Sequence, residues 1–247
     1  MSRFGQLARG VAGMIPAGAV RALGRPAAVY FHGVAQSVAD PRVETNQHDR
    51  DAFVAIVRTL KAQFDVLPAA AMGDVLKYPD RHSRAVFLMS DDGYANTLEA
   101  ADILEDLKLP WTLFVSSHHI ATGERSPIFL ALLFAFHAAG GRYRLAQLGE
   151  VVVGEDRETL AASLVARLRA LDMVRAQQAV DAMVATFDPA CLAELLARFD
   201  SERFLDWGRV RALACRGVEI GAHAHRHWPM HAGQPDAVLH EQAATHK

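Results

Sequence analysis

Apolar runs and segments of helical spacing alternate along most of this chain. The clearest run is Val86-Phe87-Leu88-Met89, which contains no charged residue and ends at Ser90. Such a run is typical of a strand buried on both faces, as in parallel sheets. Together with weaker runs, it predicts strands near residues 27–33, 64–68, 85–90, 111–116 and 217–222.

Helical spacing of apolar residues fills most of the gaps between these strands. It predicts helices over residues 51–64, 70–77, 97–107 and 206–215. Asn96 is expected to cap the helix over residues 97–107, with Glu99 at its third position. Residues 35–48 are polar and lack a period, which indicates a loop. Alternating strands and helices favour a parallel sheet with helices outside it.

Residues 126–205 break this alternation. Four Ala- and Leu-rich segments in this region have helical spacing, at residues 128–139, 159–171, 173–187 and 189–199. They predict an insertion of three or four helices. The spacing leaves open whether these helices cap a site or contact a partner. We expect them to pack beside the sheet and to supply no metal ligand, since they lack acidic and histidine residues at suitable spacing.

The composition is that of an ordinary globular protein. The chain has 247 residues, of which 51% are hydrophobic and 22% charged, enough for one large domain over residues 27–247. A formal net charge of −2 implies no general affinity for nucleic acid. Cys191 and Cys215 are too few for a disulfide framework and have no metal-type spacing, so we expect buried thiols.

Residues 1–26 form a basic leader with four arginines and no acidic residue. Gly10, Gly13 and Pro16 interrupt its apolar positions, so it does not resemble a cleaved signal peptide. The leader could lie on a membrane surface. Alternatively, it could pack against the rest of the protein or be solvated. No run reaches the ~18 apolar residues of a membrane helix. We therefore expect a cytoplasmic or membrane-peripheral protein.

Two adjacent carboxylates follow the central apolar run. Asp91 and Asp92 stand at the predicted carboxyl end of the strand, and Gly93 permits a sharp exit. Parallel α/β folds place their chemistry at such strand ends. One carboxylate could hold a cation while the other takes a proton from a neighbouring group. Asp-Asp-Gly is also a common turn sequence, so the motif alone leaves both interpretations open.

A cluster of histidines follows the last predicted strand. Five of the twelve histidines lie between residues 223 and 240. His223 and His227, four residues apart, would project to one side of a helical turn, and with Asp92 they give two imidazoles and one carboxylate. The register stays open, because His223 and His225 would share one face of a continuing strand, and His227 and His231 also have the four-residue spacing.

Taken together, the two motifs resemble those of the polysaccharide deacetylase family, the NodB-type carbohydrate esterases. Met89-Ser90-Asp91-Asp92-Gly93 is similar to the family's Thr/Ser-Phe-Asp-Asp-Gly, and His223-Ala224-His225-Arg226-His227 to its His-Ser/Thr-x-x-His. The stretch Tyr30-Phe31-His32 also resembles the family's first strand. The resemblance implies a distorted (β/α) barrel and metal-dependent hydrolysis of N-acetyl groups on a polysaccharide or oligosaccharide.

The resemblance also implies roles for individual residues. Asp91 would be the catalytic base, and Asp92, His223 and His227 would hold a divalent ion, most simply Zn²⁺. His32 and Tyr94 are candidates for substrate binding. The family's later motifs, among them the one that supplies a general acid, have no counterpart before Lys247. We therefore expect a C-terminally incomplete barrel, either as a fragment or completed by another chain, and reduced activity of this chain.

Two other functions remain open at this stage. The chain could be a non-catalytic relative that binds sugar or metal without turnover, which the absent motifs favour. It could instead be another metal-dependent amide hydrolase on the same barrel. A screen of acetylated sugars against small amides separates these possibilities.

Overall fold

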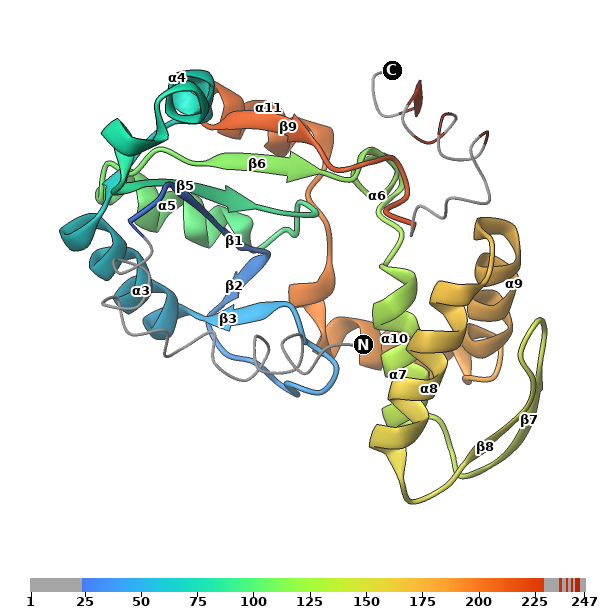
Figure 1. The fold of residues 1–247 in the computed structure, drawn as a ribbon. Coiled ribbons are helices and arrows are strands. Elements are labelled where there is room, and N and C mark those ends of the chain that lie inside the picture. Colours follow the sequence, from blue (N-terminus) through green and yellow to red (C-terminus); the bar gives the residue numbers. More distant parts are fainter. Residues whose placement is uncertain (1–23, 229–235, 237–238, 240, 242, 245–247) are drawn as a thin grey trace.

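The computed structural model describes residues 24–228 and, beyond them, residues 236, 239, 241, 243 and 244 (Figure 1). The predicted leader therefore lies almost wholly outside the described residues, as does His231, and membrane contact through the leader stays a prediction. Within the described part of the chain, no helix is both long and apolar enough to cross a bilayer.

The centre of the fold is a parallel sheet of five strands around β5 (Ala85–Ser90). β1 (Ala27–Phe31) runs along one side of β5. On the other side, β4 (Asp65–Val66) pairs with the start of β5 and β6 (Thr112–Val115) with its end. β9 (Glu219–Ala222) pairs with β6. The predicted strands and the parallel α/β class are confirmed. The described strands form an open sheet, so closure into a barrel stays a prediction.

Helices cover the sheet unequally. α3 (Arg50–Gln63), α5 (Thr97–Asp106) and α11 (Trp207–Cys215) contribute to the largest core, which also contains Val86 and Leu88 of β5. A smaller cluster holds Phe87 against η1 (Ala69–Ala71) and α4 (Met72–Lys77), which η2 (Pro79–His82) follows. Only Met89 of β5 is not fully buried, as expected for a strand covered on both faces.

A second core lies in the segment between β6 and α11. α7 (Pro127–His137), α8 (Arg157–Ala170) and α9 (Met173–Val184) pack with the antiparallel hairpin of β7 (Gly141–Leu145) and β8 (Gly149–Val153). α10 (Pro189–Arg198) and η3 (Asp200–Glu202) lead back to α11. We call residues 126–205 the helical module. Figure 1 shows it beside the edge toward which the arrows of β5, β6 and β9 point.

The structure adds short elements that the periodicity did not predict. The β7–β8 hairpin lies in a region expected to contain helices only, and its inward residues alternate, with Val151 and Val153 both buried. β2 (Gly33–Ala35) and β3 (Gln47–Asp49) form a parallel pair within the predicted loop 35–48. α6 (Ser117–Thr122) follows β6 directly. Elements of three to six residues are too short to show a period.

Two local expectations were wrong. Cys191 and Cys215 are exposed rather than buried, because the inward residues of α11 are Val210 and Leu213 and α10 buries no residue fully. Asn96 occupies the cap position of α5, but its side chain makes no capping bond. Instead its Nδ2 donates to Oε1 of Gln47 at 2.6 Å. A partner distant in sequence thus replaces the local cap.

Candidate active site

The acidic loop leaves β5 through a turn that separates its two carboxylates. Asp91 N–H donates to the carbonyl of Phe31 at 2.9 Å, which continues the pairing with β1. Asp92 then adopts a left-handed conformation with φ of 73°, followed by Gly93 at 87°. Such a conformation is uncommon for a residue with a side chain and typically marks a functional or over-determined site. It buries Asp92 and leaves Asp91 partly exposed.

The histidine loop is held against the connection between β6 and α6. His223 N–H donates to the carbonyl of Val115, and His118 N–H donates to the carbonyl of His225, both at 2.9 Å. Ala224 and His227 both have positive φ, at 61° and 56°. The loop is therefore not the helical turn that the four-residue spacing suggested. These reversals nevertheless stack the rings of His223 and His227, with centroids 4.6 Å apart.

The two loops meet at Asp92. Its Oδ1 lies 3.4 Å from Nε2 of His223 and 3.6 Å from Nε2 of His227. The carboxyl ends of β5 and β9 lie at the same edge of a parallel sheet, which brings these side chains together (Figure 1). Among the described residues, these three form the one group of potential ligand atoms lying within 4.8 Å of each other. The helical module contributes no side chain to it.

The three side chains fit a divalent cation. Oδ1 of Asp92 is buried and has no hydrogen-bond donor, and an unpaired buried carboxylate oxygen is costly without a positive partner. Tetrahedral coordination with bonds of about 2.0–2.1 Å separates ligand atoms by about 3.3 Å, close to the distances from Oδ1 to both imidazoles. Two imidazoles and a carboxylate form a donor set typical of catalytic zinc.

Burial raises the pKa of both carboxyl groups. Burial is the main cause for Asp92, whose pKa rises to about 6, with His223 opposing the rise and Asp91 adding to it. Burial also raises the pKa of Asp91, against the charges of His223 and His227. A carboxylate with a raised pKa is a stronger base, which suits Asp91 to accept a proton.

The two candidate substrate contacts lie at different depths. Nε2 of His32 lies 3.9 Å from Oδ2 of Asp92, and its side chain is 23% exposed. Burial, followed by the charges of His227 and His223, lowers the pKa of His32 to about 4, so it is neutral at physiological pH. Tyr94 is only 1% exposed and stacks on Phe204 with centroids 4.9 Å apart. Its position behind Asp92 suits support of that carboxylate.

A family model described as polysaccharide deacetylase matches residues 79–247, which is more than half of the chain. The chain belongs to the polysaccharide deacetylase family. Both motifs lie within the matched residues, whereas His32 precedes them. No curated protein matches the chain.

Several solved structures share a weaker likeness with this family member. A polysaccharide deacetylase from Bacillus cereus is 17% identical with a TM-score of 0.34, over 40% of this chain and 31% of its own. A de-N-acetylase from Aggregatibacter actinomycetemcomitans is 14% identical with a TM-score of 0.39, over 81% and 55%. IcaB from Ammonifex degensii is 14% identical with a TM-score of 0.29, over 88% and 97%. The chain thus spans about a third to a half of the first two.

Behind the acidic loop of this deacetylase-family chain lies a buried polar network. Gln47 Nε2 donates to Oε1 of Glu202 at 3.0 Å, while Gln47 Oε1 accepts from Asn96. Ser201 Oγ donates to Glu44, which is also buried. The network ties β3 and the residues just before it to η3 and to the start of α5. Leu205 N–H also donates to the carbonyl of Gly93 at 2.9 Å, so η3 and its exit support the acidic turn.

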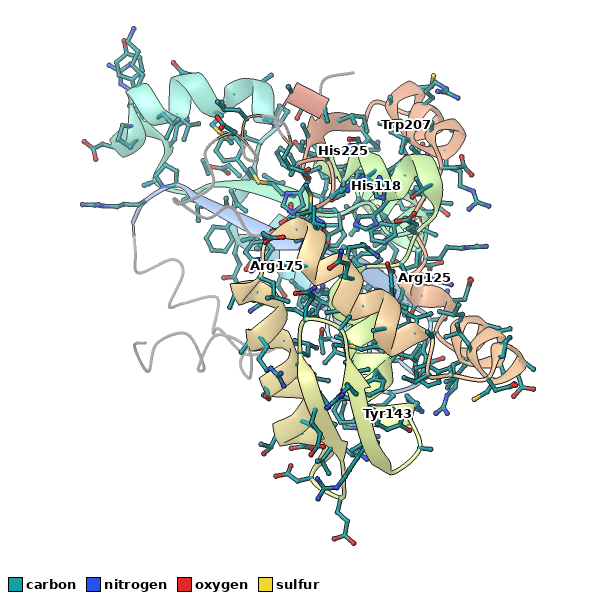
Figure 2. All side chains as sticks on the ribbon, turned by 90° about the vertical axis from the view of Figure 1, so that its right-hand side faces the viewer. His118, Arg125, Tyr143, Arg175, Trp207 and His225 are labelled. Carbon is teal, nitrogen blue, oxygen red and sulfur yellow. The ribbon has the colours of Figure 1, made fainter. Side chains whose placement is uncertain are left out.

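Three further histidines border the site, and the sequence singled out only His225 among them, as an alternative partner of His223. His119 is buried, stacks on Phe204 with centroids 4.6 Å apart, and contacts the carbonyl of Glu124 through Nδ1. His225 contacts Ser117 and lies beside His118, with centroids 5.3 Å apart, as Figure 2 shows. His118 and His119 follow a parallel strand, as both motifs do. The rule that located the motifs would have located these histidines too.

Replacing Glu202 with Gln is expected to stabilise the protein at high pH only. Burial is the main cause that raises the pKa of Glu202 to about 7. The folded state therefore holds this proton more tightly than the unfolded state. The contribution of Glu202 to the free energy of unfolding is therefore fully present below its unfolded pKa of ~4.5. It is lost as pH rises through the folded pKa of about 7, which costs roughly 3 kcal/mol of stability. Glutamine stays neutral and keeps an acceptor for Gln47.

The measurement is urea unfolding of both proteins in metal-free buffer at pH 5 and pH 8. The gain in unfolding free energy for Glu202→Gln should be larger at pH 8 by about 2–3 kcal/mol. Glu194→Gln, at an exposed position of α10, is the control. An equal effect of Glu202→Gln at both pH values would show that Glu202 does not titrate in this way.

Proposed function

We propose that this chain hydrolyses N-acetyl groups on a polysaccharide or oligosaccharide and that the reaction depends on a divalent metal ion, most simply Zn²⁺. Membership of the polysaccharide deacetylase family supports the substrate class. The observation that carries the metal dependence is the buried Oδ1 of Asp92, which has no donor and lies 3.4 and 3.6 Å from two imidazole nitrogens.

Asp92, His223 and His227 would hold the ion. When bound, a divalent ion polarises the acetyl carbonyl and lowers the pKa of a water molecule. Asp91, partly exposed beside the cluster, accepts the proton of the attacking water as general base. Asp92 does not compete for this role, because its carboxylate is buried and its Oδ1 faces the two histidines.

The surrounding residues fix this arrangement. The backbone of β6 and α6 holds the histidine loop through bonds from His118 and to Val115. The buried side chain of Tyr94 interacts electrostatically with Asp92, and Asn46 Nδ2 donates to the Tyr94 hydroxyl at 3.5 Å. His32, neutral and partly exposed, lies on the side of Oδ2 of Asp92 and is our candidate for a substrate contact.

Removing metal is expected to abolish acetate release. The chain would be treated with EDTA, dialysed and assayed for acetate with an acetylated chito-oligosaccharide, before and after stoichiometric Zn²⁺ is returned. Activity should disappear with EDTA and return with Zn²⁺, because polarisation of the carbonyl is lost and regained. Unchanged acetate release in EDTA contradicts the proposal. Cleavage of small amides but not of acetylated sugars would indicate a different amide hydrolase.

A further inference from the structure

The segment that leaves the helical module is bonded to the acidic loop. Residues 203–205 connect η3 with α11, and we call them the return segment (Figure 1). Ala95 N–H donates to the carbonyl of Arg203 at 2.7 Å. Leu205 N–H donates to the carbonyl of Gly93 at 2.9 Å. The return segment therefore holds the backbone of the acidic loop at two points, as a short paired strand would.

Phe204, at the centre of the return segment, stacks on two other rings. It forms an antiparallel β-bridge with Tyr94, and their rings stack with centroids 4.9 Å apart and 17° between the ring planes. The ring of His119 stacks on Phe204 as well, at 4.6 Å and 12°. Tyr94, Phe204 and His119 are only 1%, 5% and 4% exposed. Near-parallel contacts between buried rings are specific in geometry, so a change at Phe204 affects both neighbours.

Each of these neighbours belongs to an element that supports part of the metal cluster. Tyr94 lies in the acidic loop, two residues after Asp92. His119 belongs to α6, whose cap residue Ser116 donates from its N–H to the carbonyl of Asp92 at 3.2 Å. The next N–H of that helix, from Ser117, donates to the carbonyl of Ala224 in the histidine loop at 3.3 Å. Through Tyr94 and His119, the return segment therefore contacts the supports of both loops.

Phe204 also lies close to the cluster without belonging to it. A cavity of about 170 Å³ is bordered by Phe204 and His119 together with Asp92 and His227. The group of potential ligand atoms contains Asp92 and His227, with His223, but has no member from the helical module or the return segment. Any effect of Phe204 on a bound ion must therefore act through the placement of the ligands.

We propose that Phe204 is a positioning residue for the metal cluster, because its two ring contacts set the placement of Asp92 relative to the histidine loop. The inference rests on the proposed function, since it concerns the same metal site. It gives the helical module a part in that site although the module supplies no ligand. Ligands that are already held in place bind an ion more tightly than ligands that must first be ordered.

Replacing Phe204 with Leu should weaken Zn²⁺ binding by about 10-fold, the lower end of the loss seen when a ligand's own hydrogen-bond partner is removed. Leucine keeps a buried apolar side chain but loses both ring contacts. Competition with a chromophoric chelator measures the affinity of the full chain without any sugar. The visible absorption spectrum of the Co²⁺-loaded protein should also change, because it reports the geometry of the ligands.

Phe134→Leu is the matched control, because it makes the same substitution in the core of the helical module. Phe134 is 0% exposed and has two aromatic neighbours, Tyr143 and Phe187, with centroids 5.3 and 6.4 Å away. It should lower the melting temperature of the metal-free protein by a similar amount. Zinc affinity and the Co²⁺ spectrum should stay unchanged, since Phe134 contacts neither loop of the site.

His119→Gln tests the same stack from its other side. A glutamine amide can keep the contact with the carbonyl of Glu124 that Nδ1 of His119 makes at 2.9 Å, but the ring is lost. Zinc binding should weaken in the same direction as in Phe204→Leu. Unchanged zinc affinity in a folded Phe204→Leu variant overturns the inference, as does an equal loss in Phe134→Leu. If Phe204→Leu does not fold, unchanged affinity in His119→Gln overturns it.

Acetate release from an acetylated chito-oligosaccharide separates this inference from the proposed function. If the unaltered chain binds zinc without releasing acetate and Phe204→Leu weakens that binding, the positioning role is supported and the enzyme is contradicted. If the unaltered chain releases acetate and Phe204→Leu binds zinc equally well, the enzyme is supported and the positioning role is overturned. An unaltered chain that binds no zinc contradicts both.

Discussion

Replacing Asp91 with Asn should lower the rate of acetate release by about 10²–10⁴-fold while zinc affinity is retained. Asparagine has nearly the same shape as aspartate but cannot accept the proton of the attacking water. Burial raises the pKa of Asp91, and Asp91 is not a member of the metal cluster. Acetate release and zinc affinity would be measured on the same preparation.

The control for Asp91→Asn is Asp106→Asn, which removes an exposed carboxylate at the end of α5. It should leave both quantities unchanged. If Asp91→Asn instead lowers zinc affinity as strongly as it lowers the rate, then Asp91 is a ligand and the roles of the two carboxylates are reversed. If the rate survives the substitution, the base is another residue, and His32, whose Nε2 lies 3.9 Å from Oδ2 of Asp92, is the next candidate.

Replacing His227 with Ala should weaken Zn²⁺ binding by more than ~10²-fold. Loss of a group that hydrogen-bonds a metal ligand already costs ~10–100-fold in metal affinity, and this substitution removes one of three ligands. Asp92→Asn should have an effect of similar size, because it removes the charge at the centre of the cluster. Competition with a chromophoric chelator measures both affinities.

His225→Asn is the matched control, because it changes a histidine in the same loop. An asparagine amide can keep the contact with Ser117 Oγ that Nδ1 of His225 makes at 2.8 Å. Zinc affinity should change by less than about 3-fold, since the shell would be altered only indirectly. A large loss in His225→Asn with little loss in His227→Ala would mean that the strand-like register, with His223 and His225, holds the ion.

Spacing in the sequence was enough to locate both loops of the site. The uncharged run of β5 could belong only to a buried element, and the alternation of strands and helices indicated parallel pairing. Parallel strands present their carboxyl ends at one edge, so Asp92 and His223 had to lie near each other once β5 and β9 shared a sheet. The separation of the helical module followed in the same way from its helical period.

The choice among the histidines needed the tertiary structure. Spacing allowed His223 with His225, or His227 with a second partner, as readily as the pair found. Reversals at Ala224 and His227, held by backbone bonds to the residues after β6, decide which rings face Asp92. Neither the sign of φ nor a hydrogen bond between distant segments produces a periodic pattern in the sequence, so neither could be predicted from it.

The sequence by itself therefore determined the parallel α/β core, the place of each motif at a strand end and the chemical types at the site. Hydrophobic periodicity records which face of an element is buried, and that is sufficient for these features. Only the tertiary structure decided that His227 rather than His225 joins His223 at Asp92, and that Cys191 and Cys215 are exposed. These depend on contacts between segments far apart in the chain, which form only when the sheet and the helical module are assembled.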